Sequence, residues 1–164
     1  MDKQDLEQLL SDVADGAVAP AVALTRIQTA PTADLGFAQL DLSRGVRQGA
    51  GEVVYGAGKT ANQIAAIIKA LRDAGQERVL VTRLDAEKAA RTAELLGNDI
   101  DLGYVPDAQL ALVGGKPSPT GNGRIVVACA GTSDLPVAEE TALTAEFYGN
   151  EVDRLYDVGV AGLH

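Results

Sequence analysis

A strand, a sharp turn, a helix and a second strand follow one another between residues 124 and 157, and this order constrains the fold more than any other part of the sequence. Residues 125–130 form a short apolar run, Gly131 permits a sharp turn, and residues 135–148 carry apolar side chains at helical spacing. A crossover helix makes the strands before and after it parallel. The stretch therefore predicts a βαβ unit within a parallel sheet.

The turn between the first strand and the helix has the composition of an anion-binding site. It contains Gly131, Thr132, Ser133 and Asp134, and we expect Ser133 or Asp134 to cap the helix. Free backbone N–H groups at a helix start attract phosphate or carboxylate. An ordinary cap without a ligand is the alternative.

The second strand of this unit should bring further residues to the same edge of the sheet. The carboxyl ends of parallel neighbours emerge together, so residues 159–164 should face the turn across a cleft. His164, the single histidine, is then a candidate for proton transfer or ligand contact. A solvated terminal histidine is the alternative.

The rest of the chain alternates short helices and strands. Helical spacing and capping residues, among them the Thr60 and Gln63 pair, predict helices over residues 2–13, 17–26, 60–71 and 85–96. Short apolar runs predict strands over residues 37–42, 52–55, 78–82, 109–113, 124–130 and 152–157. The order predicts an α/β fold.

Residues 114–123 are rich in glycine, proline and other turn formers, which cannot lie inside a helix or strand. We predict a helical arm over 1–33, a small α/β domain over 34–115, a loop or linker over 116–123, and the first βαβ unit of a Rossmann-like (flavodoxin-like) parallel-sheet domain over 124–164. Two strands and one helix cannot cover both faces of a parallel sheet. We therefore expect a fragment whose second domain continues past His164, against the alternative that partner chains supply the rest of the sheet.

Two further groups of residues could hold an anion. The run Gly56–Thr60 is similar to a phosphate-binding P-loop, but Val53 stands where that motif requires glycine. Lys59 and the following helix start could still bind an anion, against the alternative of a plain capped helix. Asp41, Arg44 and Arg47 lie three residues apart, so in a helical turn they share a face, and the arginines could fork onto a phosphate. An Asp–Arg salt bridge is the alternative.

Composition excludes several function classes. The net charge of −9, from 23 acidic and 14 basic residues, argues against a nonspecific nucleic-acid binder. No run approaches the roughly 18 apolar residues of a membrane span. One cysteine, Cys129, permits no internal disulfide, which favours the cytoplasm, and its place in an apolar strand predicts a buried structural thiol. No ligands stand at zinc spacing, so we expect no metal site.

The sequence resembles the LarB family of nickel-pincer cofactor biosynthesis in two motifs. The first is AGTSDLPVAEE from Ala130 to Glu140, and the more specific second is VGVAGLH from Val158 to His164. Residues 40–49 and 52–60 resemble the N-terminal domain of that family, so the resemblance covers nearly the whole chain. The Ser-Asp turn also resembles that of aminoimidazole ribonucleotide carboxylases, whose fold the C-terminal domain of the LarB family shares.

The resemblance implies an enzyme that carboxylates the pyridinium ring of nicotinic acid adenine dinucleotide with CO₂. It also cleaves the phosphoanhydride of that dinucleotide, which releases AMP and pyridinium-3,5-biscarboxylic acid mononucleotide. Residues 124–164 would begin a carboxylase-like (PurE-like) domain. We expect a homo-oligomer without nucleic-acid or membrane partners and without a covalently bound cofactor, and Mg²⁺ accompanying the dinucleotide stays open.

The resemblance also implies roles for particular residues. The ribose phosphate would bind Gly131, Thr132, Ser133 and Asp134, and His164 would be the catalytic histidine of the cleft. Further substrate-binding residues would be Asp41, Arg44, Arg47 and Lys59. The cysteine that adds to the pyridinium ring in this family lies downstream of His164, and Cys129 does not match it, so we expect the 164-residue chain alone to be inactive.

Two alternatives come from other readings of the same residues. One is a noncatalytic nucleotide-binding or assembly module. The other is an enzyme of purine synthesis similar to aminoimidazole ribonucleotide carboxylase.

Overall fold

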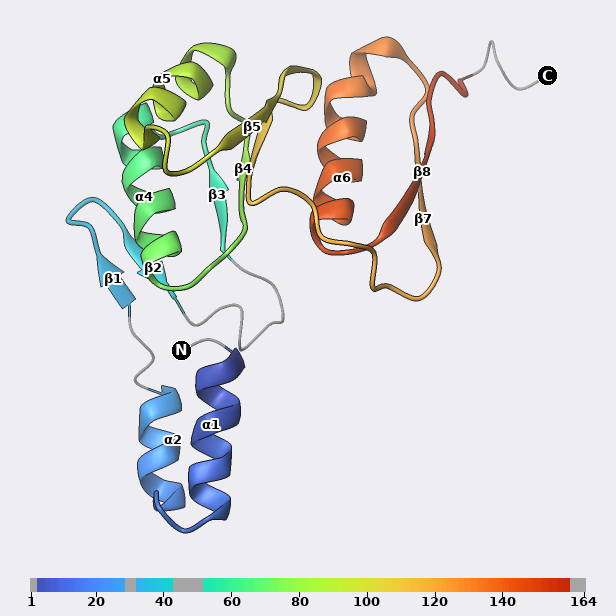
Figure 1. Ribbon diagram of the computed structural model, residues 1–164. Coiled ribbons are helices and arrows are strands. Elements are labelled where there is room, and N and C mark those ends of the chain that lie inside the picture. The colour runs from blue at the N-terminus through green and yellow to red at the C-terminus, as the bar shows by residue number, and fades with distance from the viewer. Residues whose placement is uncertain (1–2, 29–31, 43–51, 160–164) are drawn as a thin grey trace. The chain divides into compact units, whose positions relative to one another are not determined.

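The protein has the mixed α/β fold that the sequence predicts. The computed structural model describes residues 3–28, 32–42 and 52–159 (Figure 1). The chain divides into two compact units, of which the first comprises Met1–Glu52 and Ala66–Glu77, and the second comprises Val53–Ala65 and Arg78–His164.

The first unit begins with a pair of helices and continues with an antiparallel pair of strands. Its elements are α1 (Lys3–Ala14), α2 (Pro20–Gln28), β1 (Thr32–Asp34) and β2 (Gln39–Asp41). Both helices confirm the prediction. The strand expected over 37–42 is shorter, because the N–H of Gly36 donates to the Asp34 carboxylate (2.8 Å) and Phe37 lies in the resulting turn. No strand was predicted over β1.

The second unit carries two sheets and the helices between their strands. Its elements are β3 (Val53–Tyr55), β4 (Val79–Thr82), α5 (Ala86–Leu96), β5 (Leu102–Val105), the 3₁₀ turn η1 (Pro106–Ala108), β6 (Leu110–Val113), β7 (Arg124–Ala128), the 3₁₀ turn η2 (Thr132–Asp134), α6 (Leu135–Phe147) and β8 (Glu151–Leu155). Helix α4 (Ala61–Asp73) begins in this unit and continues in the first. Its apolar residues at helical spacing form a stripe that is fully buried and consists of Ile64, Ile67, Ile68 and Leu71.

The larger sheet is mixed rather than parallel. Its order is β3-β4-β6-β5, with β3 and β4 parallel and the other neighbours antiparallel. β5 was not predicted. It is an edge strand that contains Gly103 and has no fully buried side chain. Such a strand lacks the apolar run by which a buried strand is found. β4 and β6 are buried along their whole length, so both faces of the sheet are covered there.

The predicted βαβ unit is present. β7 and β8 are parallel neighbours, in register from Arg124 opposite Glu151 to Ala128 opposite Leu155, and α6 connects them. Residues 114–123 before the unit form neither helix nor strand. A larger Rossmann-like sheet around this pair stays a prediction.

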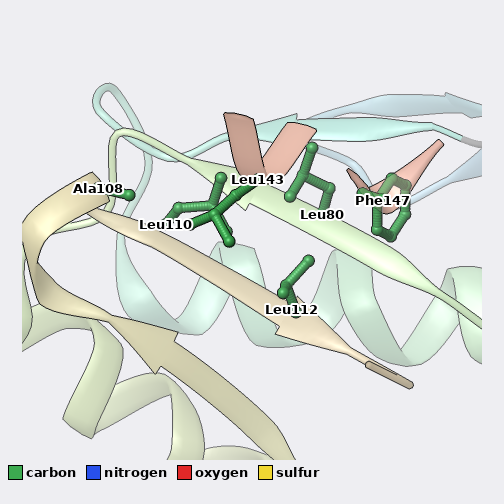
Figure 2. Packing of buried hydrophobic residues seen from close by; sticks show 6 residues of the cluster. All are labelled: Leu80, Ala108, Leu110, Leu112, Leu143 and Phe147. Carbon is green, nitrogen blue, oxygen red and sulfur yellow. The ribbon is translucent and has the colours of Figure 1, made fainter. Parts of the chain in front are cut away.

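Helix α6 packs on two sets of strands through two different sides. On one side, Leu143 and Phe147 join a cluster from the four-stranded sheet and η1 (Figure 2), made up with Leu80, Ala108, Leu110 and Leu112. On the other, Ala138 and Ala142 pack on Val127 of β7. Helical spacing predicts the alanine side, which follows the apolar face of Leu135, Ala138, Ala142 and Ala145, but not the side with Leu143 and Phe147. The first cluster joins residues before and after the linker predicted over 116–123, and the division into domains at that linker stays a prediction.

None of the helices within the described ranges is both long enough and apolar enough to cross a membrane.

We predict that Leu143→Ala destabilises the protein by about 2 to 5 kcal/mol, because it leaves a cavity between α6 and the four-stranded sheet. The side chain of Leu143 is only 4% exposed. Val137→Ala on the same helix is the matched control, since Val137 is 52% exposed and its truncation should change stability by less than about 0.5 kcal/mol. Urea unfolding measures both. Equal effects of the two substitutions would contradict the packing of α6 on this sheet.

Candidate nucleotide site at the carboxyl ends of β7 and β8

The segments that leave β7 and β8 stay side by side beyond the strand ends. The N–H of Cys129 donates to the carbonyl of Leu155, and the N–H of Val158 donates to the carbonyl of Cys129, both at 3.1 Å. The chain after each strand therefore remains paired at the carboxyl edge of this sheet.

Gly159 makes the closest approach at this edge. A Cβ atom built on Gly159 would lie 2.6 Å from the carbonyl oxygen of Ala130, a separation that no side chain tolerates. Gly159 therefore lies against Ala130, the residue that enters the Gly131 turn, whereas the cleft expected between this turn and residues 159–164 stays a prediction. Residues 160–164, with the candidate catalytic residue His164, lie outside the described residues.

The turn itself is a single 3₁₀ turn that leads directly into α6. The N–H of Asp134 donates to the carbonyl of Gly131 (3.0 Å), and the Asp134 carboxylate accepts from the N–H of Gly131 (3.3 Å). The side chains of Thr132, Ser133 and Asp134 are exposed. They are therefore accessible to a ligand at the start of a 13-residue helix.

The expected side-chain cap of α6 is wrong. Asp134 stands at the N-cap position, but its side chain makes no capping hydrogen bond to the helix. The 3₁₀ turn gives Asp134 a helical backbone conformation (φ −87°, ψ −16°), whereas a capping residue is normally extended. Its carboxylate therefore points back to Gly131 and braces the turn.

A second glycine turn follows β3, and its lysine is held by the backbone. The Lys59 ammonium donates to the carbonyl of Tyr55 (2.9 Å). The capping box at the start of α4 is confirmed, because the N–H of Thr60 donates to Gln63 Oε1 (2.9 Å) and the N–H of Gln63 donates to Thr60 Oγ1 (3.3 Å). These contacts agree with the plain capped helix, and an anion at Lys59 stays a prediction.

A second lysine, Lys88, contacts this turn and was not predicted from the sequence. The Lys88 ammonium donates to the carbonyls of Gly56 and Ala57 (3.3 and 3.4 Å) and pairs with Asp85 (3.2 Å). Asp85 caps α5 as predicted, accepting from the N–H of Lys88 (2.8 Å). Backbone hydrogen bonding from Lys88 lowers the pKa of Asp85. Lys88 thus ties the start of α5 to the glycine turn, a contact that sequence spacing does not reveal.

The remaining predicted substrate-binding residues belong to the first unit. Asp41 is the last residue of β2, opposite Thr32, within the strand predicted over 37–42, so it does not lie in the helical turn in which it would share a face with the two arginines. Strand pairing with β1 fixes its extended conformation. Arg44 and Arg47 lie outside the described residues.

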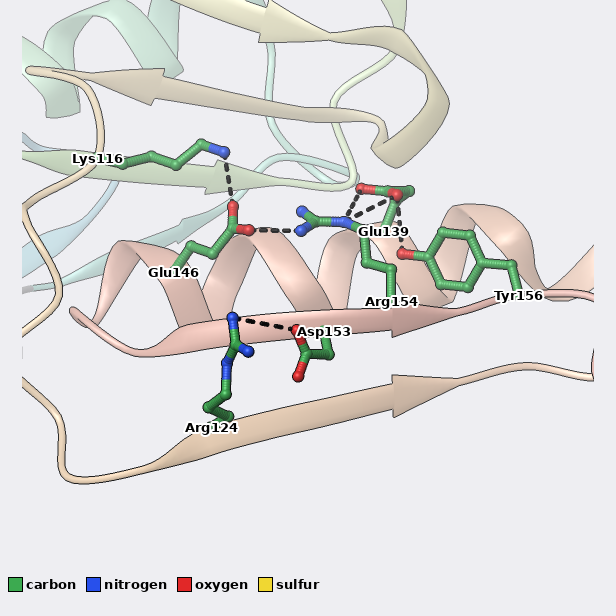
Figure 3. Close-up of polar contacts among 7 residues, drawn as sticks. All are labelled: Lys116, Arg124, Glu139, Glu146, Asp153, Arg154 and Tyr156. Carbon is green, nitrogen blue, oxygen red and sulfur yellow. Dashed lines mark hydrogen bonds and ion pairs between the residues drawn. The ribbon is translucent and has the colours of Figure 1, made fainter.

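Behind the turn, a network of charges joins α6 to β8 (Figure 3). Arg154 Nε donates to both carboxylate oxygens of Glu139 (3.2 and 3.3 Å), and Arg154 Nη1 donates to Glu146 (2.5 Å). Lys116 pairs with the other oxygen of Glu146 (2.6 Å). These half-buried charges are mutually satisfied, which fixes the rotation of α6 on the strand pair.

Tyr156 adds the last group of the network. Its hydroxyl donates to Glu139 (2.8 Å). Desolvation, with a smaller contribution from that hydrogen bond, raises the pKa of Tyr156 to about 12. Tyr156 therefore stays protonated near neutral pH and acts as a hydrogen-bond donor, not as a base.

One more ion pair reaches α6 from the four-stranded sheet. Arg83, which follows β4, pairs with Glu140 at 2.8 Å. No local sequence pattern predicts this contact, because positions 83 and 140 lie 57 residues apart in the sequence.

Cys129 is partly buried, not fully buried as the sequence predicts, and it packs on the cluster around Val127. Within residues 3–28, 32–42 and 52–159, no group of three or more His, Cys, Asp or Glu side chains could hold a metal ion.

Comparison with known proteins agrees with the resemblance seen in the sequence. The profile of the LarB/PurE-like N-terminal domain matches residues 32–114. The uncharacterized protein MJ0165 of Methanocaldococcus jannaschii is 37% identical over 132 residues, which is 77% of this chain and 50% of that protein. The chain therefore spans about half the length of this curated relative.

We predict that Gly159→Ala destabilises the protein by about 1 to 3 kcal/mol, because its Cβ would overlap the Ala130 carbonyl. Gly131→Ala is the control, since a Cβ there meets nothing within 4 Å and the residue is extended (φ −143°). Thermal unfolding of both variants measures the difference. The close approach at this edge is refuted if both substitutions are equally tolerated.

We also predict a pH-dependent contribution from Glu146. The hydrogen bond from Arg154 is the main cause that lowers its pKa below the ordinary value of 4.5. A lowered pKa gives stability that is present above the ordinary value and disappears as the pH falls through the folded-state value. Glu146→Gln should therefore cost about 1 to 3 kcal/mol at pH 7 and less as the pH falls below 4.5. Urea unfolding from pH 7 to 3 tests this, and a difference from wild type that does not change with pH would contradict it.

Proposed function

The chain belongs to the LarB/PurE-like family, and on this premise we propose that it contributes the mononucleotide-binding turn of a carboxylase-type enzyme. The proposed substrates are nicotinic acid adenine dinucleotide and CO₂. A pyridinium ring carbon forms a bond to CO₂ and loses its proton, and water breaks the phosphoanhydride. The products are AMP and pyridinium-3,5-biscarboxylic acid mononucleotide, a precursor of the nickel-pincer cofactor.

The observation that carries this proposal is the exposed 3₁₀ turn at the carboxyl edge of β7 and β8. Ligands of open α/β sheets bind outside the carboxyl ends of the strands, and the start of α6 supplies the positive end of a helix dipole. A phosphate would therefore sit against the backbone N–H groups of Thr132 and Ser133. Asp134 carries a negative charge and would repel a phosphate, so its carboxylate suits the ribose hydroxyls.

The other proposed contacts follow the family pattern. His164 would transfer a proton at the same edge, and Asp41, Arg44, Arg47 and Lys59 would contact the substrate. A homo-oligomer in the cytoplasm, Mg²⁺ accompanying the dinucleotide, and the absence of a covalently bound cofactor are parts of the same proposal.

Equilibrium binding tests the proposed role of the turn without requiring turnover. We predict that the 164-residue chain binds nicotinic acid adenine dinucleotide and that Asp134→Asn weakens binding about tenfold or more, the effect of losing a charged hydrogen bond. Asp107→Asn is the matched control, because Asp107 is also an exposed aspartate in a 3₁₀ turn. Isothermal titration calorimetry measures both.

The competing ligands decide between the alternatives. Competition by nicotinic acid mononucleotide supports the proposal, whereas competition by aminoimidazole ribonucleotide alone would favour an enzyme of purine synthesis. The proposal fails if the chain does not bind the dinucleotide, or if the two aspartate variants bind it equally well.

A further inference from the structure

Arg83 has an unusual backbone for an arginine. Its φ is +53°, in the left-handed region that residues with a side chain disfavour. It directly follows β4, at the carboxyl end of a central strand of the four-stranded sheet. A strained backbone of this kind persists only where the surrounding contacts hold it in place.

The next residue anchors Arg83 to the sheet. Leu84 is fully buried, its N–H donates to the carbonyl of Gln109 (2.8 Å), and its carbonyl accepts from the hydroxyl of Tyr104 (3.0 Å). The backbone next to Arg83 is therefore fixed by Gln109, which directly precedes β6, and by Tyr104 of β5.

The side chain of Arg83 reaches α6 from this fixed base. Its Nε lies 2.8 Å from Glu140 Oε2, and the side chain of Glu140 is only 18% exposed. Glu140 lies six positions after Asp134, in the N-terminal half of α6. The pair thus connects the four-stranded sheet to the half of the helix that carries the Gly131–Asp134 turn.

We propose that Arg83 is a positioning residue, which sets the place of the Gly131–Asp134 turn by holding α6 through Glu140. This inference rests on the proposed function, because the turn matters as the site of the ribose phosphate. Arg83 touches no substrate in this account. It holds the N-terminal half of α6, as the packing of Leu143 and Phe147 holds the C-terminal half.

The same helix offers a control of similar exposure. Lys116 pairs with Glu146 near the C-terminal end of α6 at 2.6 Å, with side-chain exposures of 44% and 18%, against 46% and 18% for Arg83 and Glu140. Lys116→Gln leaves Glu146 paired with Arg154, so urea unfolding of both variants accompanies the comparison. A merely structural role predicts that any change at the turn follows the loss of overall stability in both variants.

The experiment compares these variants in two measurements. For nicotinic acid adenine dinucleotide, Arg83→Gln should raise the Kd about threefold to tenfold, within the range of coupling between sites that do not touch. Lys116→Gln should leave the Kd within about twofold of wild type, and Arg83→Lys should recover part of the loss by keeping the charge. Equal Kd values for Arg83→Gln and Lys116→Gln would overturn the proposal.

Amide hydrogen exchange in the ligand-free protein supplies a readout that needs no substrate. Arg83→Gln should speed exchange at residues 131–135 several-fold, and Lys116→Gln should not. If wild type does not bind the dinucleotide, the proposed function fails, but the exchange difference still decides whether Arg83 positions the turn. If exchange at the turn is the same in both variants, the positioning role is wrong even where the dinucleotide binds.

Discussion

Helix α6 is held between two sheets, and the arrangement of the second unit depends on this double packing. Leu143 and Phe147 pack on the four-stranded sheet, whereas Ala138 and Ala142 pack on β7. A helix with apolar residues on one stripe can rotate or slide against its single partner, but one buried on two sides cannot. The start of α6 is consequently fixed, and with it the 3₁₀ turn proposed to hold a phosphate.

Ion pairs of α6 add to its apolar packing in fixing the orientation of the helix. Three of its carboxylates, Glu139, Glu140 and Glu146, are each paired with a cation from a different segment: Arg154, Arg83 and Lys116 in turn. Carboxylates removed from water are costly unless they are paired. The helix can therefore satisfy its charges in one orientation, which brings the Gly131 turn to the carboxyl edge where Gly159 approaches it.

The sequence predicted those parts of the fold that local patterns determine. Continuous apolar runs around Gly131 identified the βαβ unit, and the spacing of Thr60 and Gln63 identified the start of α4, because both signals lie within a few residues. β5 was not predicted, because an edge strand with half-exposed side chains has no continuous apolar run.

In the site, too, features set by neighbouring residues could be predicted, whereas contacts between residues far apart in the chain could not. The turn and its exposed polar side chains could be predicted from the motif, but the close approach of Gly159 to Ala130 could not, because the two residues lie far apart in the chain. The second apolar side of α6 and the Arg83–Glu140 pair could not, because Leu143 and Glu140 find their partners far away in the chain. The helical backbone conformation of Asp134 in the 3₁₀ turn could not be predicted either, and because of it the side chain does not cap α6 as expected.

The most direct test of the central claim is to map where the dinucleotide binds. Amide chemical shifts of the isotope-labelled chain, recorded during titration with nicotinic acid adenine dinucleotide, report every backbone position at once. Our account predicts that the largest shifts fall on Gly131, Thr132, Ser133, Asp134 and Gly159. The account would be contradicted if the chemical shifts of these five amides did not change, or if changes occurred only in the glycine turn after β3.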